Sequence, residues 1–190
     1  MFIVFNKEKI YSYFIALSTI IVLFTMGTVM MNKKDEIIET SSLVKKLPIY
    51  SVNTDKNKVA LTMNCAWDAN DIDCILDTLS KNKVYITFFI VGDFVDKYPE
   101  YVKKIADSGH EIANHSNTHP HVNQLSLDKN YEEIKLCSEK IERVTGKKTE
   151  LYRGPYGEYN DTVINAANEC GHTTIQWNID TLDYTRNFWR

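Results

Sequence analysis

Charged residues are absent from one long stretch near the start of the chain. None occurs between Ile10 and Asn32, and most residues of this run are apolar. A helix of about 20 apolar residues matches the hydrocarbon core of a bilayer. We therefore expect residues 1–9 to form a short tail, 10–31 a transmembrane anchor and 32–57 a polar linker. A cleaved signal peptide is the alternative, but Thr25-Met26-Gly27 is a poor cleavage site.

Apolar runs and helical spacings alternate from residue 58 onward. Compact apolar runs predict strands at 59–63, 84–91, 111–113 and 173–178, with a short extended piece at 151–153. Apolar residues three and four apart predict helices at 69–79, 94–106, 126–145 and 161–170, the last of them capped by Asp161. A further short strand is possible at 49–52. The alternation predicts an α/β fold with parallel strands.

Composition narrows the classes of protein. The chain has 190 residues, of which 44% are hydrophobic, enough for one domain with a sizeable core. A net charge of −3 gives no reason to expect a nucleic-acid partner. Four cysteines are spread without a Cys-x-x-Cys pair, which argues against a zinc ribbon or a thioredoxin-like site.

Histidines gather in one short stretch. Four of the five lie between Gly109 and His121, and His115 and His119 stand four residues apart, just after the strand predicted at 111–113. Two neutral imidazoles at such spacing can bind one ion of the Zn²⁺ type. Pro120 prevents a helix, so the pair must meet through loop geometry. The alternative is a histidine-rich surface loop.

Three more polar clusters follow predicted strands, and together they point to a known family. They are Asn64-Cys65-Ala66-Trp67, Arg153-Gly154-Pro155-Tyr156-Gly157 and Asp180-Thr181-Leu182-Asp183. With Thr87-Phe88-Phe89, Gly109-His110-Glu111-Ile112 and Asn114-His115, the stretch of about residues 58–184 resembles the polysaccharide deacetylases, the NodB-homology domain of carbohydrate esterase family four. The Asn-Cys-Ala-Trp motif and the apolar N-terminal run resemble those of the membrane-anchored, sporulation-type branch of that family.

The resemblance implies a deformed (β/α) barrel that hydrolyses the amide C–N bond of N-acetylated cell-wall glycans, of the peptidoglycan or chitin type. It implies a divalent metal, with Zn²⁺ expected and Co²⁺ possible, held by an aspartate and two histidines that match His115 and His119. It also implies a single-pass protein of the cell membrane, in contact with lipid through its N-terminal helix, with the domain on the extracytoplasmic side.

The remaining site residues follow from the same resemblance. Arg153 matches the arginine that orients the catalytic base, and Asp180 matches an acidic residue that supports the site. Pro155, Tyr156 and Gly157 match substrate-binding positions. Without the resemblance, the Arg153 segment would be interpreted as a tight turn and Asp180 as a helix cap.

The chain departs from the family at the catalytic positions. Asn64 stands where the family has the base, and Cys65 stands where it has the aspartate that binds the metal. An amide has no usable proton affinity near neutral pH, so Asn64 cannot act as a general base. Cys65 can ligate zinc as a thiolate or simply pack in the core. Asp68, Asp71 and Asp183 are nearby carboxylates, but none fits the motif.

The last family motif, a leucine with a histidine that protonates the leaving amine, is absent before the final residue, Arg190. We therefore expect residues 58–190 to form a barrel that is incomplete at its C-terminus, in either a degenerate product or a fragment. Two functions fit: a membrane-anchored deacetylase impaired in this form, or a non-catalytic remnant that binds glycan. An unstable truncated product is a third possibility.

Overall fold

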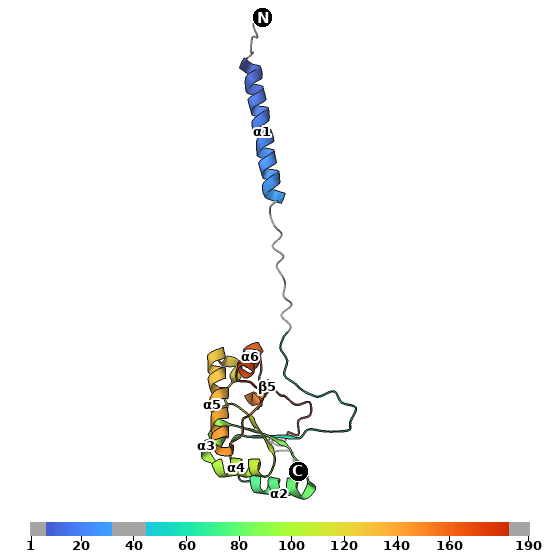
Figure 1. Ribbon diagram of the computed structural model, residues 1–190, viewed down its shortest axis with the longest axis vertical. Coiled ribbons are helices and arrows are strands. Elements are labelled where there is room, and N and C mark those ends of the chain that lie inside the picture. Colours follow the sequence, from blue (N-terminus) through green and yellow to red (C-terminus); the bar gives the residue numbers. More distant parts are fainter. Residues whose placement is uncertain (1–6, 32–44, 183–190) are drawn as a thin grey trace. The chain divides into compact units, whose positions relative to one another are not determined.

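The computed structural model describes residues 7–31 and 45–182, in two units divided after Val44 (Figure 1). In the first unit, helix α1 spans Lys7–Met31. Among the residues that the structure describes, no helix combines the length and the apolar character needed to span a bilayer. Parts of the predicted tail and linker, and Asp183, lie outside the described residues.

A parallel sheet of five strands forms the centre of the second unit. The strands are β1 (Thr62–Cys65), β2 (Thr87–Ile90), β3 (Glu111–Asn114), β4 (Leu151–Tyr152) and β5 (Thr173–Thr174). They pair in sequential order, β1-β2-β3-β4-β5, and every pair is parallel. This confirms the predicted α/β fold with parallel strands, and the sequential order is the one found in (β/α) barrels.

Helices connect the strands. They are α2 (Ile72–Asn82), α3 (Gly92–Lys97), α4 (Pro99–Asp107), α5 (Leu127–Thr145) and α6 (Asp161–Glu169), with short 3₁₀ turns η1 (Val122–Gln124) and η2 (Pro155–Gly157). The limits of α5 follow local chemistry, since the Ser126 side chain accepts from the Lys129 N–H at its start and Gly146 ends it with φ 70°.

Two predictions about the helices were wrong. The single helix expected at 94–106 is two helices, because Tyr98 leaves the helical region and Pro99 begins a new helix. The cap of α6 is Asn160 and not Asp161: the Asn160 side chain accepts from the Val163 N–H, and Asp161 lies in the first turn.

The folded unit also begins earlier than residue 58. The Ile49 N–H donates to the Thr174 carbonyl at 2.9 Å, and the Gln176 N–H donates to the Ile49 carbonyl at 2.8 Å, so Ile49 pairs with the outer edge of β5. The Lys46 N–H donates to Asp161 Oδ1 at 3.1 Å. The end of the predicted linker therefore belongs to the domain, because its backbone supplies partners for an exposed sheet edge.

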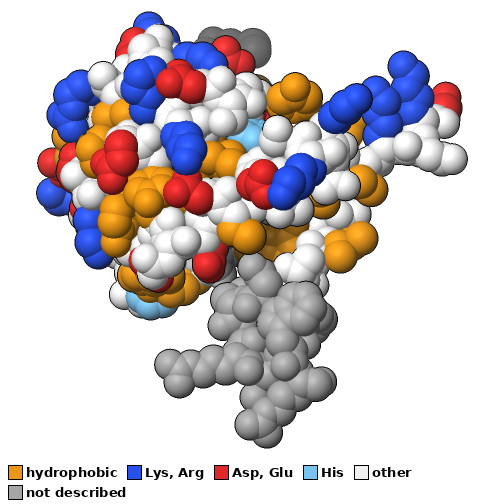
Figure 2. Space-filling view, turned by 90° about the horizontal axis from the view of Figure 1, so that it is seen from below, with side chains coloured by type: hydrophobic (Ala, Val, Ile, Leu, Met, Phe, Trp, Pro, Cys, Tyr) orange, Lys and Arg blue, Asp and Glu red, His pale blue; other side chains and the backbone are white. Residues whose placement is uncertain are grey.

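The main core lies between the sheet and the helices that cover it. Its fully buried members include Phe88, Ile90, Val95, Val102, Ile105 and Ile141. A smaller cluster joins η1, α5, β4 and α6 through Val122, Ile134, Tyr152 and Val163. On the face drawn in Figure 2, basic and acidic side chains are interspersed over the surface of the domain. The polar clusters singled out in the sequence lie at or after the carboxyl ends of β1, β3, β4 and β5.

Candidate functional site

Residues from four strands converge at one edge of the sheet. Asn64 lies in β1, while His115, Arg153 and Gln176 follow the ends of β3, β4 and β5. The carboxyl ends of parallel strands meet at the same edge, so clusters far apart in sequence come together there. The structure thereby joins three of the four clusters that the sequence pointed to.

Arg153 is the buried centre of this edge. Its side chain is 3% exposed, and the guanidinium lies 3.9 Å from the centroid of the Phe89 ring. Nη1 donates to Asn64 Oδ1 at 2.9 Å, and Nη2 donates to the Gln176 carbonyl at 3.3 Å. Arg153 thus contacts Asn64, the residue that the resemblance puts at the base position, and its partner there is an amide.

The charge on Arg153 has no carboxylate among these partners. Both acceptors are neutral oxygens, and Nε is buried with no hydrogen-bond partner. Burial lowers the pKa of Arg153 to about 10. A buried cation without a counter-charge is costly. The buried guanidinium of Arg153 therefore has only neutral hydrogen-bond partners, one of which is the Asn64 amide.

The two histidines that the sequence predicted as metal ligands are neutral and close together. The ring centroids of His115 and His119 are 5.1 Å apart. His115 Nδ1 lies 2.7 Å from the Arg153 carbonyl, which can only accept, so the proton is on Nδ1 and the Nε2 lone pair is free. Burial lowers the pKa of His115 to about 3 and also lowers the pKa of His119. The two imidazoles therefore suit metal ligation.

Glu133 of α5 holds the loop between these histidines. Its Oε2 accepts from the Asn117 N–H at 2.9 Å and from the Thr118 N–H at 2.8 Å, and its Oε1 accepts from the Thr118 hydroxyl at 3.0 Å. The His119 N–H donates to Ser116 Oγ at 3.1 Å. The sequence did not identify Glu133, because one more acidic residue on the polar face of a helix carries no signal.

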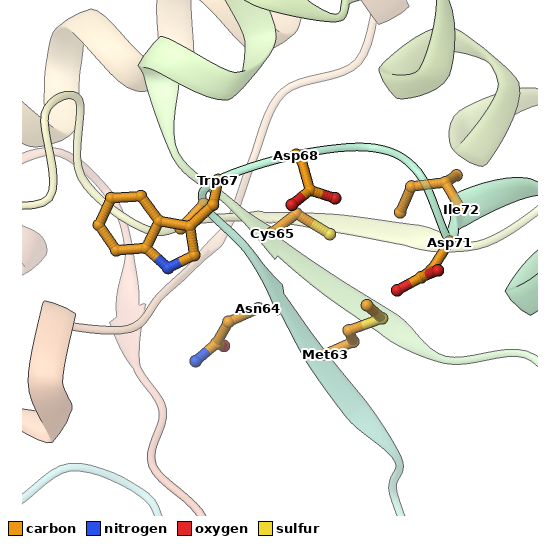
Figure 3. Close-up of a pocket in the computed structure, with 8 residues that line it drawn as sticks. Met63, Asn64, Cys65, Trp67, Asp68, Asp71 and Ile72 are labelled. Carbon is orange, nitrogen blue, oxygen red and sulfur yellow. The ribbon is translucent and has the colours of Figure 1, made fainter. Parts of the chain in front are cut away.

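Cys65 lies in the main core, which favours packing over zinc ligation, the two roles that the sequence left open. It is 4% exposed within the main core, and burial raises the pKa of its thiol to about 12. Figure 3 shows its sulfur on the opposite side of β1 from Asn64. Within residues 7–31 and 45–182, no three His, Cys, Asp or Glu side chains are grouped to hold a metal. The described residues thus do not fit the three-ligand metal site that the resemblance implies.

No described carboxylate replaces the missing base at Asn64. Asp68 and Asp71 line a pocket of about 170 Å³ that also includes Asn64, Cys65 and Trp67. In Figure 3 their carboxylates lie on the Cys65 side of β1. Asp180 is exposed, and its Oδ1 accepts from the Leu182 N–H at 2.9 Å, which is a local turn contact; its supporting role at the site remains a prediction.

Aromatic rings surround His119 at the surface. The centroid of His119 is 5.3 Å from that of Trp67 and 4.6 Å from that of Tyr156. His121 stacks on Tyr156 at 4.3 Å. Trp67 is 71% exposed and Tyr156 is 57% exposed. We name Trp67, His119, His121 and Tyr156 the aromatic ledge. The sequence identified two of its members as site residues, and only the fold adds Trp67 and His121.

The backbone of the turn at Pro155–Gly157 holds Tyr156 beside His119. Tyr156 has φ 58°, a left-handed conformation that is unusual for a tyrosine. The Gln176 side chain donates to the Gly157 carbonyl at 2.8 Å. A side chain at Gly157 would approach Trp177 to 3.0 Å, and Gly157 has φ 69°. The substrate-binding assignment of Pro155, Tyr156 and Gly157 remains a prediction, but the turn holds Tyr156 beside His119.

Comparison with known proteins supports a single family. Residues 51–175 match the family described as polysaccharide deacetylase. The protein YlxY of Bacillus subtilis is 37% identical over 139 residues, which cover 73% of this chain and 44% of that protein. The peptidoglycan-N-acetylmuramic acid deacetylase PdaA of the same organism is 31% identical over 151 residues, which cover 78% of this chain and 57% of PdaA.

Solved structures give the same answer. A CE4 family pseudoenzyme from Bacillus anthracis superposes with a TM-score of 0.72 and 35% identity, over 74% of this chain and 50% of that one. A mutant of that pseudoenzyme is described as having restored enzymatic activity. The chain spans about half the length of the relatives YlxY and PdaA that it matches. The match over residues 51–175, together with the parallel sheet and its polar edge, shows that this chain belongs to the polysaccharide deacetylase family.

Proposed function

We propose that the chain is directed at N-acetylated cell-wall glycans and that its hydrolytic step is impaired in this form. The observation that carries the proposal is the contact of Arg153 Nη1 with Asn64 Oδ1 at 2.9 Å. A water molecule that attacks an amide must lose a proton, and an asparagine cannot take it. The arginine is in place, but the proton acceptor that it would orient is missing.

The aromatic ledge favours retained glycan binding, the second function that fits the sequence. Exposed aromatic rings supply a large contact area at low cost in conformational entropy, and sugar rings offer them apolar C–H faces. Relatives are named as deacetylases of peptidoglycan and of chitooligosaccharides. We infer that this chain recognises a glycan of the same type and still binds it although hydrolysis is impaired.

We also propose that His115 and His119 bind a divalent metal, Zn²⁺ or Co²⁺, as two of the ligands of a weak site. The support is the free Nε2 of His115 and the neutral, neighbouring ring of His119. A bound ion would polarise the amide carbonyl of a substrate. No third His, Cys, Asp or Glu side chain of the described residues is grouped with them, so the pair by itself lacks the ligand set that the family uses for hydrolysis.

For location, we propose a single-pass anchor at residues 10–31, with the domain outside the cytoplasm, as in the membrane-bound, sporulation-type branch. The support is the uncharged run from Ile10 to Asn32 in the sequence and the cell-wall substrates named for relatives, and not helix α1, since no described helix combines the length and the apolar character needed to span a bilayer. If the proposal holds, the chain expressed in a bacterium pellets with membranes and resists carbonate extraction. A secreted product that starts near Asn32 would instead establish a cleaved signal peptide.

The test of function measures acetate release and glycan retention on the same preparation. The full chain is incubated with chitin oligomers and with peptidoglycan, with added Zn²⁺ or Co²⁺. We expect retention on the glycan with no clear acetate release. Robust release that is abolished by His119→Ala would overturn the proposal, since it would mean that another carboxylate serves as the base.

A further inference from the structure

The orientation of the Asn64 amide follows from its partner. Arginine has five N–H donors and no acceptor, so the atom 2.9 Å from Arg153 Nη1 must be the Asn64 oxygen. The amide nitrogen then faces the other way. Asn64 is exposed, and Figure 3 shows it on the same side of β1 as the Trp67 indole. A hydrogen-bond donor is therefore presented where an active hydrolase would present the accepting oxygen of a carboxylate.

The surroundings of that donor are cationic and aromatic. Arg153 lies directly behind Asn64, and both of its acceptors are neutral oxygens. Trp67 is 71% exposed, three residues along the chain, and its ring centroid is 5.3 Å from that of His119. Asp68 and Asp71 line the same pocket as Asn64 and Trp67, but in Figure 3 their carboxylates lie on the Cys65 side of β1. The group that suits such a place is a neutral or anionic acceptor beside a flat apolar face.

We propose that Asn64 and Trp67 form a subsite that selects glycans by their intact N-acetyl groups. The Asn64 Nδ2 donates to the carbonyl oxygen of the acetamido group, while the sugar ring packs against Trp67. A deacetylated sugar offers an ammonium group at this position. That group can only donate and is positively charged, so both the Asn64 amide and Arg153 oppose it.

The inference deepens the proposed function and rests on it. In a hydrolase, a carboxylate at this position activates water for attack on the acetyl group. Here the same position offers a donor to the acetyl group itself. The substitution that removes the base therefore changes the site from one that consumes the acetylated form into one that recognises it.

The experiment compares two oligosaccharides of equal length, one fully N-acetylated chitin oligomer and one fully deacetylated. Binding to the full chain is measured by calorimetry, with a chelator present so that no metal-dependent turnover occurs. Asn64→Asp replaces the donor by an acceptor of the same shape. Asn70→Asp, an exposed position in the loop between β1 and α2, is the control for added charge. Trp67→Ala tests stacking, with Tyr85→Ala as the control at a ring that is 72% exposed.

We expect the unmodified chain to bind the acetylated oligomer at least about tenfold more tightly than the deacetylated one. Asn64→Asp should remove this preference and Asn70→Asp should keep it. Trp67→Ala should weaken binding of the acetylated oligomer by about tenfold, and Tyr85→Ala should not. Equal binding of both oligomers, or an Asn64→Asp variant that keeps the preference, overturns the subsite while glycan binding stands. If no form of the chain binds either oligomer, the proposed function fails as well.

Discussion

Replacing Asn64 by aspartate should stabilise the fold. Arg153 is 3% exposed, and its Nη1 already lies 2.9 Å from Asn64 Oδ1. Aspartate has nearly the same shape, so the change adds a counter-charge without moving an atom. A buried cation bound only to neutral acceptors would then gain a charged partner.

The magnitude follows from the geometry. Two unit charges about 4 Å apart attract by about 4 kcal/mol at an effective dielectric constant of about 20. The neutral hydrogen bond that is replaced already contributes about 1 kcal/mol. Residue 64 is exposed, so water screens part of the gain. We expect the free energy of unfolding to rise by about 1–2 kcal/mol at pH 7.

The pH dependence gives an independent check. The Arg153 charge should hold the pKa of Asp at position 64 below the unfolded value of about 3.9. A carboxyl with a depressed folded-state pKa stabilises the fold above the unfolded pKa and loses that contribution as pH falls through the folded one. The advantage of Asn64→Asp should therefore be constant above about pH 5 and vanish near pH 2–3.

Urea unfolding of the full chain at several pH values, followed by the fluorescence of its tryptophans, measures this difference. Asn70→Asp carries the same added charge without the arginine and should change stability by less than about 0.5 kcal/mol. If Asn64→Asp were no more stable than Asn70→Asp at pH 7, the account of Arg153 as an uncompensated buried cation would be wrong.

Three further predictions concern the histidines and their loop. His115→Ala should abolish most of the zinc binding measured by calorimetry. Cys65→Ala should leave zinc binding unchanged, because the thiol faces the core. Equal losses in the two variants would show that Cys65 is a ligand. Glu133→Ala should cost about 2–3 kcal/mol, since three donors of the loop lose a charged acceptor. Glu133→Gln should recover part of it, and hydrogen exchange at the Asn117 and Thr118 amides reports the loop directly; unchanged exchange in Glu133→Ala would contradict the assignment. Burial lowers the pKa of His115 to about 3 and lowers that of His172. Their neutral forms thus stabilise the fold above the unfolded pKa of about 6.5. Unfolding experiments should show stability falling below that pH, by up to about 1.4 kcal/mol per pH unit from His115. A flat profile between pH 6.5 and 5 would refute this.

Local chemistry allowed much of the fold to be predicted from the sequence. Alternating apolar runs indicated parallel strands, and Ser126 and Gly146 marked the limits of α5. The break at Tyr98-Pro99 was also readable, because proline begins helices and disturbs the residue before it, but the apolar spacing on both sides concealed it. Ile49 was not assignable to the sheet, since the edge it covers is formed by β5, more than 120 residues later.

The sequence by itself, through the motif resemblance, pointed to the main parts of the site: the histidine pair, Arg153 and the missing base at Asn64. The strand predicted at 59–63 ended before Asn64 and Cys65, whereas β1 of the structure runs to Cys65, so these two side chains face opposite sides of the strand. Which side faces the core and which faces the groove was decided by the tertiary structure, where Cys65 packs in the main core and Asn64 meets Arg153. Glu133 and the aromatic ledge depend likewise on contacts between elements far apart in the chain. Such contacts depend on how the helices and loops pack on the sheet, and the local sequence pattern does not show which distant residues will meet.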